Sequence, residues 1–433
     1  MPTQAVRVCE NTASLFRGDR SALTARPQPG TPTDPSRLTR AELGNGLALA
    51  GVIFLRITGL FMLVPILALY VDQIDGATPT LIGLAIGIYG LTQATFQMPM
   101  GAMSDRFGRK PIILLGLALF AGGSVLAGLS TNIWGVIAGR ALQGMGAISS
   151  AVLALAADLT REQQRTKVNA LIGITFGLSF VFGMVLGPWL NTMVALRGVF
   201  FTAAAGGVLA MLVLVFFVRS AKTHTAINKT PLTRAQLSRL FRSPSLFHLN
   251  FGVFALHFLI TAAFVLIPLK LVADTEIAAA DHVRIYLAAM LLSLVILVPL
   301  LRASGRRSPG RRVDVRFVAG LALMSLSFVW PFTSGLDAVV RIGLFFVAFN
   351  YLEAVLPALV SVAAPPAEKG AALGVYASSQ FCGAFLGGVS AGLALDFAGR
   401  FMIALLCAGV ALVWLRVGMR APRYEETGEP AQA

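Results

Sequence analysis

Three charged side chains stand deep inside long apolar stretches of this 433-residue sequence: Arg56, Arg140 and Glu353. A charge at the centre of a membrane-spanning helix costs about 2.5–3.5 kcal/mol on insertion scales, so such a residue usually lines a pathway or contacts a partner. Glu353 is the carboxylate that we expect to bind and release a coupling proton, because an apolar setting favours its protonated form. The sequence leaves open a static ion pair of Glu353 with Arg56, Arg140 or His257.

A lone histidine within such a stretch, His257, is the second titratable candidate. Its imidazole could change charge near neutral pH. The alternative is a histidine that only packs and forms hydrogen bonds. We group it with Glu353, Arg140 and Arg56 as a proton-coupling residue.

Polar side chains spaced three or four residues apart share one face of a helix. Such pairs predict a substrate cavity, although they also commonly bond one helix to another. The predicted cavity residues are Gln93, Gln97, Gln143, Asn350, Tyr376 and Gln380.

The composition indicates that these residues stand in membrane helices. The chain is 56% hydrophobic and 13% charged, whereas a soluble domain carries about 25% charged residues. The formal net charge is +15, but the Lys and Arg residues fall in short clusters between apolar stretches, which indicates topology and not nucleic-acid binding. The spacing of the cysteines and histidines predicts neither a disulfide framework nor a metal site, and no catalytic motif predicts an enzyme.

Apolar stretches of about 20 residues can cross a bilayer, and there only helices satisfy their own backbone. The sequence therefore predicts an all-α membrane protein with twelve transmembrane helices in two pseudo-symmetric six-helix halves. The stretches lie near residues 45–70, 80–103, 110–130, 133–157, 167–191, 198–218, 246–272, 284–302, 315–334, 337–363, 370–396 and 400–419.

The positions of Lys and Arg predict the orientation and the division of the chain. Most of them fall on one side if both termini are cytoplasmic, which is the expected excess. We predict a disordered cytoplasmic tail at residues 1–42, for which an organelle transit peptide is the alternative. The predicted halves are 43–218 and 246–420, separated by a cytoplasmic linker at 219–245 and followed by a tail at 421–433.

Three motifs follow one another between the second and the fifth of these stretches. GAMSDRFGRKPI fits the pattern G-x-x-x-D-R-x-G-R-K, RALQG follows in the fourth stretch, and a ladder of glycines ending in Gly-Pro runs along the fifth. In these motifs the sequence resembles the major facilitator superfamily. Stretches such as MLVPILALY, ADLTREQQRTK and FFVAFNYLEAVLPALVS resemble its YajR-type transporters of bacterial inner membranes. Those relatives carry a soluble C-terminal domain, whose role is not carried over to a sequence that ends in APRYEETGEPAQA.

The resemblance implies a drug:proton antiporter that works by alternating access, with the proton gradient as its energy source and no cofactor. It implies a conformational latch in which Asp105 faces the N-terminus of the eleventh span and is released when the halves rock apart. The alternative for the basic residues of this motif is that they only anchor the chain on the cytoplasmic side. The latch residues are Gly101, Asp105, Arg106, Gly108, Arg109, Lys110 and Asp158.

The fifth stretch carries the residues of the antiporter-like motif, Gly173, Gly177, Gly183, Gly187 and Pro188. Small residues of this kind permit close helix contact. By resemblance, the motif implies export. The predicted partners are a small-molecule substrate, protons and membrane lipid, with no nucleic acid, and the predicted state is a monomer in the cell inner membrane.

Two other functions remain possible at this level. A uniporter or symporter of a polar metabolite such as a sugar would keep the fold, although the scarcity of tryptophan and of polar clusters argues mildly against it. An integral-membrane enzyme or a sensor would show clusters of His, Asp or Glu, which the sequence does not have. A fixed channel is disfavoured because duplicated halves predict alternating access around a midplane site.

Overall fold

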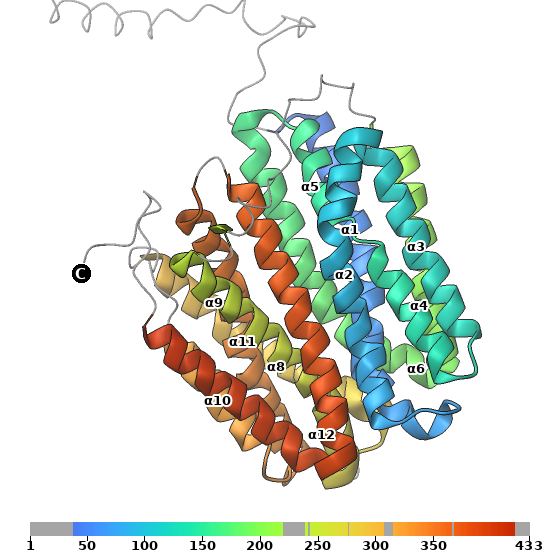
Figure 1. Ribbon diagram of the computed structural model, residues 1–433, viewed down its shortest axis with the longest axis vertical. Coiled ribbons are helices and arrows are strands. Elements are labelled where there is room, and N and C mark those ends of the chain that lie inside the picture. The colour runs from blue at the N-terminus through green and yellow to red at the C-terminus, as the bar shows by residue number, and fades with distance from the viewer. Residues whose placement is uncertain are drawn as a thin grey trace, which may run out of the picture.

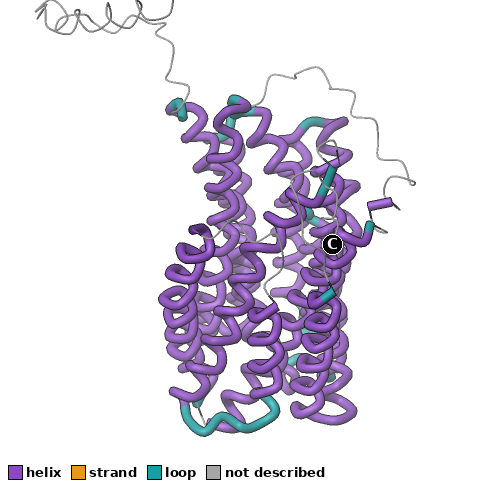
Figure 2. Tube along the Cα trace, turned by 90° about the vertical axis from the view of Figure 1, so that its left-hand side faces the viewer, coloured by secondary structure: helices purple, strands orange, loops and turns teal. Residues whose placement is uncertain are grey.

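The computed structural model describes residues 38–219, 239–240, 243–275, 277–306, 315–365 and 368–420. Most of the predicted terminal tails and of the linker lies outside these residues. The described chain folds into helices that run side by side as a bundle (Figures 1 and 2). The helices are α1 (Arg40–Leu67), α2 (Pro79–Phe107), α3 (Arg109–Leu129), α4 (Ile133–Met145), α5 (Ser149–Asp158), α6 (Arg165–Phe217), α8 (Pro244–Thr275), α9 (His282–Arg306), α10 (Val315–Ser327), α11 (Gly335–Ala363) and α12 (Lys369–Met419), with short 3-10 helices η3 (Ala68–Gln73), η4 (Glu162–Gln164) and η5 (Ala279–Asp281).

Two of these helices are too long for a single crossing. Helix α6 has 53 residues and α12 has 51, which at about 1.5 Å per residue far exceeds a hydrocarbon core of about 30 Å. Each contains a residue with positive φ, Ala195 at 52° and Gly399 at 73°. Figure 1 shows the red end of α12 turning away from its orange first part at the lower end of the bundle. Each long helix is thus two segments joined at a sharp break.

The number of membrane crossings that the structure shows agrees only in part with the twelve that were predicted. Within the described residues, nine helices are long and apolar enough to cross a membrane, and α10 is a shorter apolar helix. The breaks in α6 and α12 agree with the predicted boundaries between the fifth and sixth and between the eleventh and twelfth stretches. The all-helical fold is confirmed, and twelve separate crossings stay a prediction.

Helix α1 begins within the segment that the sequence analysis assigned to the tail. Thr39 and Glu42 form a reciprocal capping box, in which each side chain accepts a hydrogen bond from the other residue's backbone N–H, so the helix begins at Arg40 and not after residue 42. Glu42 also accepts hydrogen bonds from the Nε and Nη2 atoms of Arg161 at 2.9 and 3.0 Å. This carboxylate raises the pKa of the Arg161 guanidinium. Helix α1 is thereby fixed to the loop between α5 and α6.

The two ends of the bundle differ in charge. We call the end that carries Arg109, Lys110 and Arg161 the basic end, which is uppermost in Figure 1. The opposite end carries η3, η5 and the break at Gly399. Helices α1–α6 form the first half and α8–α12 the second, and the two halves meet along α2 with α12 and α6 with α9.

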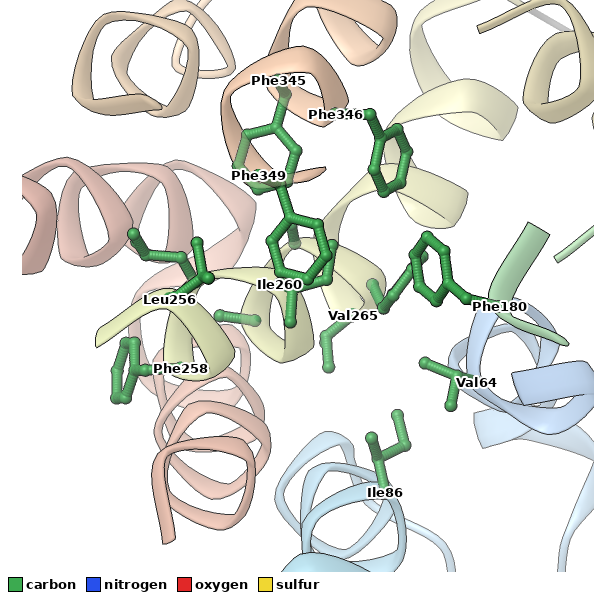
Figure 3. Packing of buried hydrophobic residues seen from close by; sticks show 14 of the residues in the cluster. Val64, Ile86, Phe180, Leu256, Phe258, Ile260, Val265, Phe345, Phe346 and Phe349 are labelled. Atoms are coloured by element: carbon green, nitrogen blue, oxygen red, sulfur yellow. The ribbon is translucent and has the colours of Figure 1, made fainter. Parts of the chain in front are cut away.

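An aromatic cluster joins the halves in the interior. Phe180 of α6 lies with its ring centroid 5.8 Å from that of Phe346 and 5.9 Å from that of Phe349, both on α11. Figure 3 shows Phe180 beside the rings of Phe346 and Phe349, with Val64 and Ile86 of the first half below it in the view. Phe180 is only 7% exposed, so this contact is part of the packed core.

Candidate functional site

A buried cationic cluster occupies the first half. Arg56 of α1 is 0% exposed, and its Nη2 donates a hydrogen bond of 2.8 Å to Oε1 of Gln93 on α2. The Nε2 of Gln93 in turn donates to Oε1 of Gln97 at 3.2 Å. Gln93 and Gln97 are buried at 0% and 6% exposure. These amides therefore bond α2 to α1.

Arg140 of α4 extends this cluster. Its Nε donates to the carbonyl oxygen of Ala85 at 3.2 Å and its Nη1 to Oε1 of Gln143 at 2.8 Å. The amide of Gln143 then donates to Oγ of Ser124 on α3 at 2.7 Å. All of these side chains are buried. Arg140 and Gln143 consequently tie α2, α3 and α4 together.

The ring of Tyr89 lies between the two arginines. The guanidinium carbons of Arg56 and Arg140 are 6.0 and 5.1 Å from its centroid, within the range of cation–π attraction. Tyr89 was not predicted as a site residue, although it lies four residues before Gln93 and therefore on the same helix face.

This geometry corrects the prediction that three glutamines line a cavity, and it answers whether Glu353 pairs with a buried arginine. Gln93, Gln97 and Gln143 belong to helix contacts and not to an accessible cavity surface, because each is buried in a chain of hydrogen bonds. Within the described chain, neither Arg56 nor Arg140 forms an ion pair with Glu353. The static arginine pair that the sequence left open is absent from this conformation.

The titratable group of the second half is an arrangement of three side chains from three helices. Glu353 of α11 accepts a hydrogen bond of 3.4 Å at Oε1 from Nε2 of Gln380 on α12. Its other oxygen lies 3.8 Å from Nε2 of His257 on α8. The amide nitrogen of Gln380 is also 2.7 Å from that same histidine nitrogen. The Gln380 amide thus stands between a carboxylate and an imidazole.

The hydrogen bonds of His257 indicate which of its two ring nitrogens carries a hydrogen. The Nδ1 atom of His257 lies 3.2 Å from the carbonyl oxygen of Val253, which can only accept, so Nδ1 carries the hydrogen. With the amide nitrogen of Gln380 facing it, Nε2 is the acceptor of that contact. Glu353 has 38% of its side chain exposed, and His257 has 15%. The carboxylate and imidazole side chains are therefore partly exposed, whereas the arginines of the first half are sealed.

Two further predicted cavity residues lie on the same helices. Nδ2 of Asn350 donates to Oγ of Ser293 on α9 at 3.1 Å, and this contact is partly buried. The pair was not predicted, because Ser293 has no polar neighbour at helical spacing in the sequence. Tyr376 of α12 is buried, at 5% exposure. Gln380 thus contacts Glu353 directly and Asn350 lies three residues before it on α11, while the substrate cavity stays a prediction.

At the basic end, the charged motif forms a compact cluster. Arg109 pairs with Asp105 one turn before it, and its Nε lies 3.3 Å from Oδ2 of Asp158 on α5. The Nη1 of Arg109 also donates to Oγ of Ser104 at 2.8 Å. Asp105 is half exposed, and in this conformation it pairs with Arg109 on its own half of the protein. The charge cluster matches the sequence analysis, and the contact of Asp105 with the eleventh span stays a prediction.

The remaining motif residues serve local structure. Gly108 has φ of 95°, a conformation that side chains rarely adopt, and it separates α2 from α3. Lys110 donates to the carbonyl oxygen of Val218 at 2.8 Å, so it caps the C-terminal end of α6. A Cβ on Gly101 would lie 3.2 Å from Oγ of Ser150. Arg106 is exposed and lies over the ring of Phe107.

The glycine ladder of α6 divides into two unlike parts. A Cβ on Gly183 would lie 2.7 Å from Cβ of Phe61, and one on Gly187 would lie 2.1 Å from the carbonyl oxygen of Met62. Around Gly173 and Gly177 a Cβ would meet nothing within 4 Å. The prediction of close contact is thus wrong for Gly173 and Gly177, because no neighbouring helix atom lies within 4 Å of a Cβ at either position. Pro188 is buried next to Gly187.

Comparisons with known proteins agree on one family. The sequence model of the Major Facilitator Superfamily matches residues 49–364. The chain is 42% identical to the inner membrane transport protein YajR of Escherichia coli K12 over 391 residues, covering 90% of this chain and 86% of that protein. It is 28% identical to the multidrug resistance protein MdtH of Yersinia pestis (strain Pestoides F) over 349 residues, covering 78% and 80%.

Solved structures share the fold. A bacterial homologue of the human lysosomal transporter Spinster, in an inward-facing and occupied conformation, matches with a TM-score of 0.72 at 13% identity, covering 92% of this chain and 100% of that one. A D-xylose-proton symporter matches with a TM-score of 0.68 at 14% identity, covering 90% and 99%. At these identities the likeness concerns the fold alone.

Proposed function

Because this chain belongs to the major facilitator superfamily and is a secondary transporter, we propose that it exports small apolar or amphipathic compounds in exchange for protons. The observation that carries the proposal is the arrangement of Glu353, His257 and Gln380. A half-buried carboxylate and a neutral imidazole joined by one amide can hold and release protons inside the membrane. The similarity to a multidrug resistance protein supports the substrate class.

The hydrogen-bond pattern suggests how protonation is sensed. With Glu353 ionised and His257 neutral at Nε2, the Gln380 amide donates toward both. When a proton binds the Glu353 carboxylate, the acid becomes a donor, and the Gln380 oxygen is the acceptor that can meet it. Protonation at Oε1 therefore requires the Gln380 amide to turn over, whereas an acid protonated at Oε2 still accepts from that amide at Oε1. Protonation of Glu353 at Oε1 thereby sets the orientation of a side chain on α12, which also contacts the first half through α2.

The aromatic residues next to this group fit the proposed substrate class. The ring of Phe349 lies 5.9 Å from that of His257 and also stacks on Phe180 of the first half. An apolar or amphipathic compound that separated these rings would contact both halves and lie beside Glu353. Binding of such a compound and protonation of Glu353 would then compete for the same place, which is the requirement for exchange.

The buried arginines have a different role in this proposal. Arg56 and Arg140 stay charged and hold α1–α4 together, since each is committed to amide or carbonyl acceptors in a sealed cluster. The first half then moves as a unit. We further propose that the protein lies in the cell inner membrane with both termini cytoplasmic, on the basis of the distribution of basic residues.

The experiment is substrate-triggered proton flux in vesicles. Purified protein is reconstituted with a pH-sensitive dye inside, and cationic and neutral drugs are added to wild type, Glu353→Gln and the matched control Glu162→Gln, whose carboxylate is exposed on η4. Wild type and Glu162→Gln should show flux, and Glu353→Gln should show none while still exchanging substrate.

Two outcomes would contradict the proposal. Flux in Glu353→Gln equal to that of wild type would remove Glu353 as the proton carrier. Exchange of a polar metabolite that is independent of the pH gradient, with no drug-dependent flux in wild type, would favour the uniporter or symporter.

A further inference from the structure

A carboxylate of the second half binds the first turn of a helix in the first half. The backbone N–H of Thr80 donates to Oδ2 of Asp396 at 2.9 Å, and the Thr80 hydroxyl donates to the same oxygen. Thr80 is the second residue of α2, and Asp396 stands on α12. The N–H groups of a first helical turn have no partner within the helix and form its positive end. The contact is therefore a charge-assisted bond between the two halves.

The helices next to this bond approach each other backbone to backbone. A Cβ on Gly83 would lie 2.3 Å from the carbonyl oxygen of Gly388, and one on Gly392 would lie 2.5 Å from that of Pro79. One on Gly87 would lie 2.6 Å from the carbonyl oxygen of Phe385. Any side chain at these positions would separate α2 from α12, so glycine is what permits closure at the opposite end of the bundle.

The neighbouring Arg400 bonds to α8, and Asp396 bonds to Thr80. Arg400 donates to the carbonyl oxygen of Leu269 at 3.3 Å and lies 3.8 Å from Asp274, both on α8 of its own half. At the basic end, by contrast, Asp105 pairs with Arg109 within the first half. The charged contact between α2 and α12 thus lies at the opposite end.

We propose that Asp396 is a positioning residue of the transport cycle, a reversible clasp that holds the opposite end closed and must break each time that end opens. Gly83, Gly87, Gly388 and Gly392 give the surface on which the clasp closes. The inference concerns the motion of a secondary transporter and holds whatever the substrate and whether or not protons are exchanged.

The test measures the distance between the halves directly. Spin labels are placed at Thr131→Cys, before α4, and at Leu336→Cys, in the first turn of α11; both positions are exposed at the opposite end. Cys9, Cys382 and Cys407 are replaced beforehand. Electron–electron distance distributions are then recorded for the purified protein with the native site and with Asp396→Asn, Thr80→Val and Gly83→Ala.

Asp396→Asn should raise the ratio of long to short distances by about two- to fivefold, as expected for a charge at a helix terminus. Thr80→Val should give a smaller rise in the same direction, because the backbone N–H remains. Gly83→Ala should give the largest rise. Asp281→Asn, an exposed carboxylate at the same end that pairs with Arg284 within the second half, and Gly51→Ala, with open space around it, should match the parent.

Distributions that are unchanged in both Asp396→Asn and Gly83→Ala, with monomeric and helical protein, would overturn the clasp. A rise in Asp281→Asn equal to that in Asp396→Asn would also overturn it, since the effect would then be one of general charge. Because no substrate or pH gradient enters the measurement, its result is independent of the vesicle flux experiment.

Discussion

The two halves of this transporter hold polar groups of opposite character at their centres. The first half buries two guanidinium groups, Arg56 and Arg140, among amides and an aromatic ring, each below 2% exposure. The second half places a carboxylate, Glu353, beside a histidine, His257, with 38% of the carboxylate side chain exposed. A sealed cation that keeps its charge stabilises a rigid unit, whereas an accessible acid can change its charge. On our proposal, the buried arginines of the first half stabilise its structure, and the carboxylate of the second half exchanges protons.

The largest effect that would sharpen this comparison is on stability in the first half. Arg140→Ala should lower the free energy of unfolding by about 3 kcal/mol, because it leaves the Gln143 amide oxygen buried without a donor and removes the bond to the Ala85 carbonyl. Thermal unfolding in detergent measures it, with the exposed Arg284→Ala as the matched control. An unfolding temperature equal to that of the control would mean that the cluster does not hold the half together.

A smaller effect should appear in transport when the second-half amide is removed. Gln380→Leu should lower the proton-coupled transport rate by about tenfold with little change in stability, because the hydrogen bond that joins Glu353 and His257 is lost. Ser379→Ala is the control, since its hydroxyl bonds only within α12. Equal rates in Gln380→Leu and Ser379→Ala would show that the amide does not link the two groups.

The glycines of α6 offer a test within one helix. Gly187→Ala should destabilise the protein by about 1–3 kcal/mol, because its Cβ would strike the Met62 carbonyl oxygen. Gly177→Ala should be neutral or should stabilise by up to about 1 kcal/mol, since its Cβ meets open space and alanine favours helix. Unfolding temperatures in the reverse order would contradict the observed helix face.

The smallest change in stability is expected at the basic end. Asp105→Asn should leave the free energy of unfolding within about 1 kcal/mol of wild type, because its ion pair with Arg109 is exposed. If Asp105 acts as a latch in another conformation, the variant should bind substrate normally and transport it more slowly. A full transport rate would remove the latch, and Glu162→Gln at the same end is the control.

Several features were predictable from sequence because they depend on composition or on short spacing. The all-helical fold and the break near residue 195 follow from apolar run lengths, and the cluster of Arg109 with Asp158 was implied by the family resemblance. Glu353 was found because a carboxylate inside an apolar run is costly and therefore unusual. The family resemblance that these motifs indicated is confirmed.

Other features depend on which neighbour covers a helix face, which spacing does not give. Gln93 and Gln97 share a face with each other, yet the sequence could not show that Arg56 lies against that face. The clasp of Asp396 on Thr80 joins residues 316 positions apart. Such a contact requires the packing of the halves, and an aspartate near the end of an apolar stretch otherwise resembles any surface carboxylate.

The central claim is that Glu353 carries the coupling proton, and proton release on substrate binding tests it most directly. Purified protein in weakly buffered detergent solution with a pH indicator is mixed with a drug that it binds, for wild type and Glu353→Gln. Our account predicts proton release from wild type and none from Glu353→Gln at equal substrate occupancy. Equal release from both proteins would contradict it and would place the exchanged proton on another group.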